Sequence, residues 1–357
     1  MNKRTITVAA ALVAGLLVYA EGFSQTPASD RLNTAVSPSL THFPINPTPY
    51  FVPYPGQVAL VTYINLLGAN YFLTATDGGG QAFNALTTSG TGTGTYERFT
   101  VVPSGSGYQS FVTENGYYVS VNPGVTSGPY VTQTTGTAAS DATLLKPQDA
   151  HAYGGYTLET YYDYFLYFSA GPGQSTNAIG TNYGSLPQDY YVVVYPQQCG
   201  DLGSGYKYRI SFADGEYDGV PNYFEGMLQA INGGGLASSP IYEDYEDDAS
   251  TEFTFIQQPN GTYALQTSDG TNYVTAVDGG GLLGGNALAT NRTVAQAWEQ
   301  FVIKDIGSCE YTIQTVSGYY LASRIGAGNL LSTDISDPNK APAIGYSPYF
   351  VLRPVWN

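Results

Sequence analysis

Cationic side chains are scarce in this sequence. It has 12 lysine and arginine residues against 28 aspartate and glutamate residues among 357, which gives a formal net charge of −16. A chain this acidic repels phosphate backbones and anionic lipid surfaces, and no basic stripe compensates locally. We therefore expect no nucleic-acid partner.

Signatures of catalysis are also missing. The sequence has no Gly-x-Ser-x-Gly elbow and no cysteine and histidine spacing typical of zinc sites. Only two histidines occur, and His42 lies in a proline-rich stretch, so a nucleophile would have His151 as its one realistic base. A pair of carboxylates that hydrolyses glycosides leaves no local sequence mark. We expect no enzymatic activity, with a polysaccharide-active enzyme as the weaker alternative.

The residues that are abundant indicate an all-β protein. Gly 43, Pro 21 and Tyr 33 occur with only 11% charged residues, and long amphipathic helices are absent. Glycine and proline supply turns, and tyrosine favours strands. At 357 residues the chain is long enough for two or three domains with cores of their own.

The amino terminus predicts export. Lys3 and Arg4 precede an apolar stretch from Ile6 to Ala20, which is shorter than the roughly 20 residues that a membrane span needs. We interpret residues 1–24 as a signal peptide that is removed, which leaves no membrane insertion and a secreted protein, extracellular or periplasmic. A retained signal anchor is the alternative. Seven prolines in residues 25–56 then predict an extended linker.

Export makes the two cysteines candidates for a disulfide. In an oxidising compartment Cys199 and Cys309 would form a bond that ties the segment between two domains onto the second domain. The alternative is two separate thiols, because the sequence does not show whether their Cα atoms come within bridging distance.

A strand followed by a glycine-rich or polar turn recurs six times. The copies begin at Phe72, Tyr118, Tyr167, Met227, Tyr273 and Tyr320, with successive spacings of 46, 49, 60, 46 and 47 residues. Only the step from the third to the fourth copy is long, as expected if three repeats close into one body and three into another. The sequence therefore predicts two tandem β-trefoils of three four-stranded repeats each, at residues 57–197 and 205–357, with a connector at 198–204. A six-bladed propeller is the alternative.

The fifth repeat carries a family resemblance. Its segments YVTAVDGGG, ALATNR and AWEQFVI resemble the repeat of fascin-type β-trefoils, which typically has a Trp-Glu-x-Phe closing strand. In the first repeat, YERF at residues 96–99 has the same pattern with tyrosine in place of tryptophan. The QxW signature of ricin-type lectin trefoils is missing. The resemblance implies actin cross-linking, but an acidic chain is repelled by an acidic filament, so we expect no actin binding.

The motif residues themselves are expected to be structural. We predict that five aromatic residues lie in the core: Phe99, Tyr273, Trp298, Phe301 and Phe350. The glycines at 78–80 and 279–281 are predicted to adopt backbone angles closed to other residues. Asp77 and Asp278 precede these glycines and are expected to hold the turns, with ligand contact as the alternative.

Two stretches are candidates for binding. Residues 153–165, YGGYTLETYYDYF, have more tyrosines than an alternating core strand needs, so Tyr161, Tyr162 and Asp163 are candidate ligand-binding residues. Aromatic rings and carboxylates suit sugars. The expected partner is a glycan or extracellular polysaccharide, and the alternative is a structural or adhesive protein that binds a cell-surface or matrix protein.

The other stretch, DGEYDGVPNYFE, has the oxygen spacing of a calcium loop. It offers five candidate Ca²⁺ ligands: Asp214, Glu216, Asp218, the carbonyl of Val220, and Glu225. The glutamate at the third position and a flanking pattern of strands depart from the helix–loop–helix pattern. A solvated acidic hairpin is the alternative.

Overall fold

The structure is a computed structural model of the chain. It describes residues 56–64, 69–90, 93–122, 132–149, 155–168, 179–182, 192–212, 216–217, 220–221, 227–237, 241–244, 248–283, 287–324, 331–341 and 346–356. All of them belong to the second of two units, residues 47–357. The predicted signal peptide and almost all of the predicted linker lie outside the described residues.

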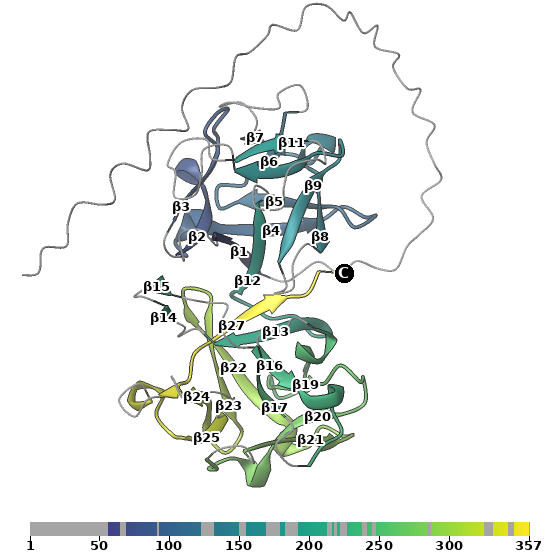
Figure 1. The fold of residues 1–357 in the computed structure, drawn as a ribbon, viewed down its shortest axis with the longest axis vertical. Helices are drawn as coiled ribbons and strands as arrows, with labels where there is room; N and C mark the ends of the chain where they lie inside the picture. Colours follow the sequence, from purple (N-terminus) through teal and green to yellow (C-terminus); the bar gives the residue numbers. More distant parts are fainter. Residues whose placement is uncertain are drawn as a thin grey trace, which may run out of the picture. The chain divides into compact units, whose positions relative to one another are not determined.

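The described part of the chain is all-β, as predicted (Figure 1). Its helical elements are 3₁₀ turns of three residues each, which connect strands. Within this part, no helix combines the length and the apolar content that crossing a bilayer would require.

The first strand set pairs into a closed ring of six strands with three hairpins. Its strands are β1 (Gln57–Ile64), β2 (Ala69–Ala75), β3 (Leu86–Gly90), β4 (Arg98–Pro103), β5 (Gln109–Thr113), β6 (Tyr118–Val121), β7 (Thr132–Gly136), β8 (Leu145–Asp149), β9 (Tyr156–Thr160), β10 (Phe165–Phe168), β11 (Ile179–Asn182) and β12 (Val193–Cys199). The antiparallel ring runs β1–β4–β5–β8–β9–β12 and back to β1. The hairpins are β2–β3, β6–β7 and β10–β11.

The second strand set repeats this pattern. Its strands are β13 (Tyr206–Phe212), β16 (Met227–Ala230), β17 (Ile241–Asp244), β18 (Glu252–Gln257), β19 (Tyr263–Gln266), β20 (Tyr273–Ala276), β21 (Leu288–Arg292), β22 (Gln300–Gly307), β23 (Glu310–Thr315), β24 (Tyr320–Arg324), β25 (Leu331–Ile335), β26 (Tyr346–Ser347) and β27 (Phe350–Pro354). The ring runs β13–β18–β19–β22–β23–β27 and back to β13. Because pairing crosses repeat boundaries, the arrangement is trefoil-like and not a set of separate propeller blades. The predicted domain boundaries stay predictions.

Each ring surrounds its own apolar core. Inward positions along the strands are filled by aliphatic and aromatic side chains, among them Leu60, Phe99 and Phe111 in the first set and Phe253 and Phe301 in the second. Alternation along each strand directs every second side chain inward, which is why short strands with a period of two build this core.

The core prediction is confirmed for Phe99, Phe301 and Phe350, which are fully buried. It is wrong for Trp298, whose side chain is 43% exposed, and Tyr273 is only half-buried. Trp298 lies in the 3₁₀ turn η8 (Ala297–Glu299) before β22, where strand alternation does not yet apply. The tryptophan therefore lies over the surface while Phe301, three residues later, enters the core.

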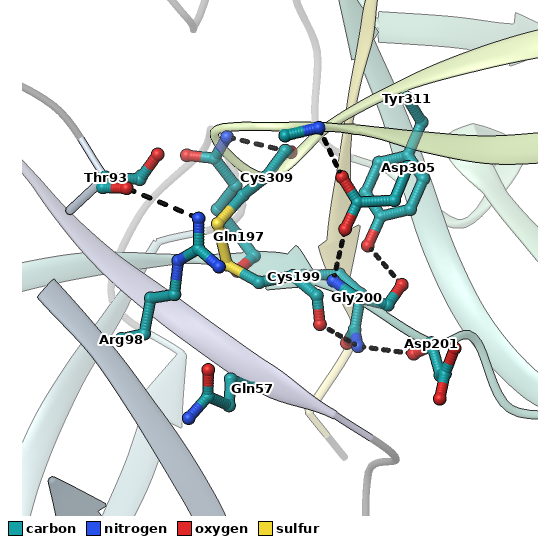
Figure 2. Close-up of a disulfide and its surroundings, with 12 residues drawn as sticks. Gln57, Thr93, Arg98, Gln197, Cys199, Gly200, Asp201, Asp305, Cys309 and Tyr311 are labelled. Atoms are coloured by element: carbon teal, nitrogen blue, oxygen red, sulfur yellow. Dashed lines mark hydrogen bonds between the residues drawn. A yellow bond between two sulfur atoms is a disulfide. The ribbon is translucent and has the colours of Figure 1, made fainter. Parts of the chain in front are cut away.

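A disulfide joins the end of the first strand set to the second, between Cys199 of β12 and Cys309 between β22 and β23, with 4.3 Å between the Cα atoms (Figure 2). Hydrogen bonds surround it. Gln197 Nε2 donates to the Cys309 carbonyl at 3.1 Å, and Tyr311 Oη donates to the Gly200 carbonyl at 2.9 Å. The segment after β12 is thus held by side-chain contacts as well as by the covalent bond.

The carboxyl end of the chain also reaches the first core. Trp356 follows β27 of the second strand set, but its ring lies 5.2 Å from the ring of Tyr156 and 6.0 Å from that of Phe111. Its backbone N–H donates to Tyr156 Oη at 3.0 Å. Trp356 is therefore part of the core of the first strand set.

Candidate functional site

Three tyrosines form a cluster on the first strand set, which we call the tyrosine cluster: Tyr108, Tyr161 and Tyr162. The ring centroids of Tyr108 and Tyr161 lie 5.8 Å apart with a tilt of 56°, and those of Tyr161 and Tyr162 lie 5.7 Å apart, edge to face. Tyr161 is 39% exposed, and the other two are half-buried. The cluster presents aromatic surface to solvent next to polar groups.

Strand register explains why residues more than fifty positions apart meet here. Gln109 of β5 pairs with Leu145 of β8, and Leu145 also pairs with Thr160 of β9. Tyr108 directly precedes Gln109, and Tyr161 directly follows Thr160. Because these two strands flank β8 on either side, the two tyrosines come within ring contact across it.

Local turns hold both tyrosines in place. Before β5, the N–H of Tyr108 donates to the Gly105 carbonyl at 3.0 Å, and the Tyr108 carbonyl accepts from Ser104 N at 2.9 Å. After β9, Thr160 Oγ1 accepts from the N–H of Tyr164 at 3.1 Å, while Asp163 adopts a left-handed φ of 61°. Aspartate tolerates this conformation better than most residues.

The electrostatics of the cluster are acidic. Burial, followed by the charges of Glu159 and Asp163, raises the pKa of Tyr108 above its ordinary value, so its phenol stays protonated through the physiological range. Glu159 accepts a hydrogen bond from Gln148 Nε2 and pairs in register with Lys146. The site thus combines aromatic faces with hydroxyl and carboxylate groups, and the amide of Gln148 is bonded to one of those carboxylates.

Of the predicted binding residues, the structure brings Tyr161 and Tyr162 into ring contact and places the exposed Asp163 in the same turn. It adds Tyr108 and Glu159, which the sequence did not single out. A signal for Tyr108 was present in PSGSGY, where an aromatic residue directly follows a turn with two glycines. Its partner on β9 could not be found without the strand register.

Asp77 and Asp278 lie elsewhere, in the turns after β2 and β20. Their φ angles are 52° and 54°, and the glycines that follow all have positive φ, which confirms the prediction for those glycines. Asp77 Oδ2 accepts from Gln81 Nε2 at 3.1 Å. Both aspartates are exposed, so a role in the turn leaves their carboxylates accessible to a ligand.

The calcium prediction falls mostly outside the described residues, which exclude Asp214, Asp218 and Glu225. The backbone of Glu216 belongs to the short strand β14 (Glu216–Tyr217), and that of Val220 to its partner β15 (Val220–Pro221). In the part of the chain that the structure describes, no group of three acidic, histidine or cysteine residues is arranged to hold a metal ion. Calcium binding by the loop stays a prediction.

No protein-family model and no curated protein matches the chain. Solved structures with similar strand arrangements include a designed three-fold symmetric protein, ThreeFoil (14% identity, 38% of this chain, 96% of that one, TM-score 0.33). A non-toxic homologue of type II RIPs from Momordica charantia (bitter gourd), in complex with α-methyl-D-galactoside, has 9% identity over 84% of this chain and 98% of that one, with a TM-score of 0.28.

A mosquitocidal holotoxin has 10% identity over 83% of this chain, with a TM-score of 0.32, and this chain spans about a third of its length, 34%. Superpositions this loose carry no argument about ligand or activity. The trefoil-like arrangement rests on the strand pairing itself, and membership in the fascin-type family stays a prediction.

Proposed function

We propose that the two strand sets are two tandem β-trefoils of an exported, non-catalytic protein that binds carbohydrate. The observation that carries this proposal is the tyrosine cluster, where three aromatic rings lie beside the exposed carboxylate of Asp163. The expected ligand is a glycan or extracellular polysaccharide.

The chemistry of the cluster suits a sugar. The apolar C–H face of a pyranose packs against aromatic rings, and its hydroxyls can donate to carboxylates and exchange hydrogen bonds with phenols and amides. Glu159 and Asp163, whose charges act on Tyr108, supply acceptors, and the phenol hydroxyls of the cluster supply donors. The resulting surface offers stacking and hydrogen bonding without requiring a charged ligand.

Export is supported by the disulfide between Cys199 and Cys309, because such bonds persist in oxidising compartments.

A structural or adhesive protein that binds another protein is the second candidate, since six large apolar side chains of the second set are more than two-fifths exposed. These are Leu283, Val294, Trp298, Val302, Ile306 and Val316.

Replacing Tyr161 with alanine should weaken glycan binding about tenfold, equivalent to roughly 1.4 kcal/mol, because it removes the ring shared by both pairs of the cluster. A glycan array with and without calcium would identify ligands, and titration calorimetry would give their affinities. Tyr161→Phe should keep most of the affinity if stacking dominates.

Val302→Ala is the matched control, since Val302 is a similarly exposed apolar side chain (42%) on β22 of the second set. Unchanged affinity in Tyr161→Ala would exclude the cluster as the site. Absence of any glycan ligand, together with capture of a defined surface protein, would favour the second candidate. Release of reducing sugar would instead indicate an enzyme.

A further inference from the structure

An exposed aromatic residue covers a glycine turn at two equivalent places in the chain. Trp298 is the second residue of η8 (Ala297–Glu299), and Tyr96 is the second residue of η2 (Thr95–Glu97). They are 43% and 45% exposed. Both lie just before a ring strand, β22 and β4 respectively, so the same repeat position carries a large ring on the surface of each strand set.

Each ring lies against the turn that carries one of the exposed aspartates. A Cβ added at Gly279 would lie 3.1 Å from Trp298 Nε1, and one added at Gly78 would lie 2.8 Å from Tyr96 Cε1. These glycines directly follow Asp278 and Asp77. The absence of a side chain at the glycine lets the ring approach the backbone beside the carboxylate.

A second aromatic residue and a polar side chain also lie against each of the two glycine turns. Tyr319 lies against Gly280 as Tyr117 lies against Gly79, at 3.1 and 2.9 Å from the added Cβ positions. Ser317 in one and Asn115 in the other contact the first glycine of the turn. We call these two sets the turn platforms: Asp278, Trp298, Ser317 and Tyr319 in the second strand set, and Asp77, Tyr96, Asn115 and Tyr117 in the first.

The fourth repeat shows that folding of the turn does not require the aromatic cover. Its turn has Asn232 at φ 55°, ψ 21°, nearly the angles of Asp77 and Asp278, and three glycines of positive φ follow it. There the residue equivalent to Trp298 is Ser250, the second residue of η6 (Ala249–Thr251). The nearest side chain to Gly233 is Ser268, not an aromatic ring.

The glutamate after each exposed ring holds it in place. Glu299 is 3% exposed, and its carboxylate accepts from the N–H of Gln296 at 2.8 Å, which closes the turn η8 around Trp298. Glu97 accepts from Thr74 Oγ1 at 2.9 Å and fixes η2 to β2. The rings are thus presented by structured turns, which lowers the entropy lost when a ligand packs on them.

We propose that the turn platforms are two further, equivalent saccharide-binding sites, one in each strand set, in addition to the tyrosine cluster, and that the chain is therefore multivalent for a polysaccharide. This inference rests on the proposed carbohydrate-binding function but assigns it residues other than the tyrosine cluster. Each platform offers a ring for a pyranose face and an adjacent carboxylate for its hydroxyls. Two such sites on one chain would raise the apparent affinity for a polymer through effective concentration.

Tryptophan fluorescence provides a direct test, because the chain has two tryptophans and Trp356 is only 6% exposed. Soluble β-glucan, galactan and chitin oligosaccharides serve as probes, with acrylamide as the quencher. A probe that binds should protect Trp298 from quenching in the wild type and in Tyr161→Ala. Protection should disappear in Trp298→Phe, whose remaining emission comes from Trp356.

Binding to immobilised polysaccharide tests multivalency. Trp298→Ser and Tyr96→Ser copy the fourth repeat, so circular dichroism should show an unchanged fold. Each should lower retention on the polymer by at least about tenfold through lost avidity. If saccharide binds but leaves the quenching of Trp298 unchanged in the wild type, and retention does not fall in Trp298→Ser or Tyr96→Ser, the platforms are excluded while the proposed function stands. If no probe binds and no polysaccharide is retained, both proposals are overturned.

Discussion

Replacing both cysteines with alanine is expected to lower the free energy of unfolding of the second strand set by about 4 to 5 kcal/mol. The disulfide joins residues 110 positions apart, so in the unfolded chain it closes a loop that contains β13 through β22. Without the bond, the unfolded state gains the entropy of opening that loop.

The native contacts around the bond show what else the two substitutions change. Cys199 and Cys309 are 2% and 1% exposed and pack with Ala59, Val61 and Phe72 of the first strand set. The hydrogen bond from the N–H of Gly200 to Asp305 Oδ2, 2.9 Å long, does not involve either sulfur. Alanine at both positions therefore leaves this hydrogen bond intact, but it removes two buried sulfurs together with the covalent closure.

Denaturant unfolding with and without a reductant measures the effect. The double alanine variant should unfold at a lower denaturant concentration than the oxidised wild type. When the wild type is reduced after unfolding and refolded under reducing conditions, its transition should move to that of the variant. Coincident transitions of the variant and the oxidised wild type would contradict a stabilising disulfide.

The repeats could be predicted from sequence because their markers are local. A strand followed by Asp77 or Asp278 and then three glycines predicts a turn whose left-handed angles few other residues adopt, and the structure has those angles there. The spacing of the six strand-and-turn copies then separates the repeats into two groups of three. The trefoil-like arrangement then arises because the ring strands of each group of three repeats pair with one another until the ring closes.

The prediction that Trp298 lies in the core is wrong because the alternating burial of strand β22 does not reach back to residue 298. AWEQFVI looks like a strand that buries alternate large side chains, but its first three residues form η8, and only Gln300 begins β22. In the 3₁₀ turn, Glu299 is the buried residue and Trp298 lies outside it. Buried glutamate beside exposed tryptophan reverses the order that hydrophobicity alone predicts.

Only part of the tyrosine cluster could be predicted from the sequence, because the rest depends on pairing between distant strands. Tyr161, Tyr162 and Asp163 stood out as an excess of tyrosine in one segment, whereas Tyr108 joins them through pairing with β8. Register between strands distant in sequence is set by the whole ring and leaves no mark near Tyr108 itself. The turn platforms likewise unite residues from three separate segments of each strand set.

The contact of Trp356 with the first core is the extreme case, since it lies 200 residues from Tyr156 in sequence. Trp356→Ala is expected to lower the free energy of unfolding by about 3 to 5 kcal/mol, because it leaves a cavity against Tyr156 and Phe111. The loss should fall on the first strand set, whose core contains the indole, although the substitution lies after the last strand of the second set.

Hydrogen exchange resolved by segment would locate that loss. Amides of β5 and β9, which carry Phe111 and Tyr156, should exchange faster in Trp356→Ala, while those of β19 and β20 should keep their protection. Trp298→Ser is the matched control, since it removes the same side chain type from an exposed position and should leave both regions protected. Faster exchange confined to the second strand set would show that Trp356 stabilises its own sheet and not the first core. Because Trp356 packs in the core of the first set while Phe350–Pro354, shortly before it, form β27 of the second, the two strand sets are expected to resist unfolding together.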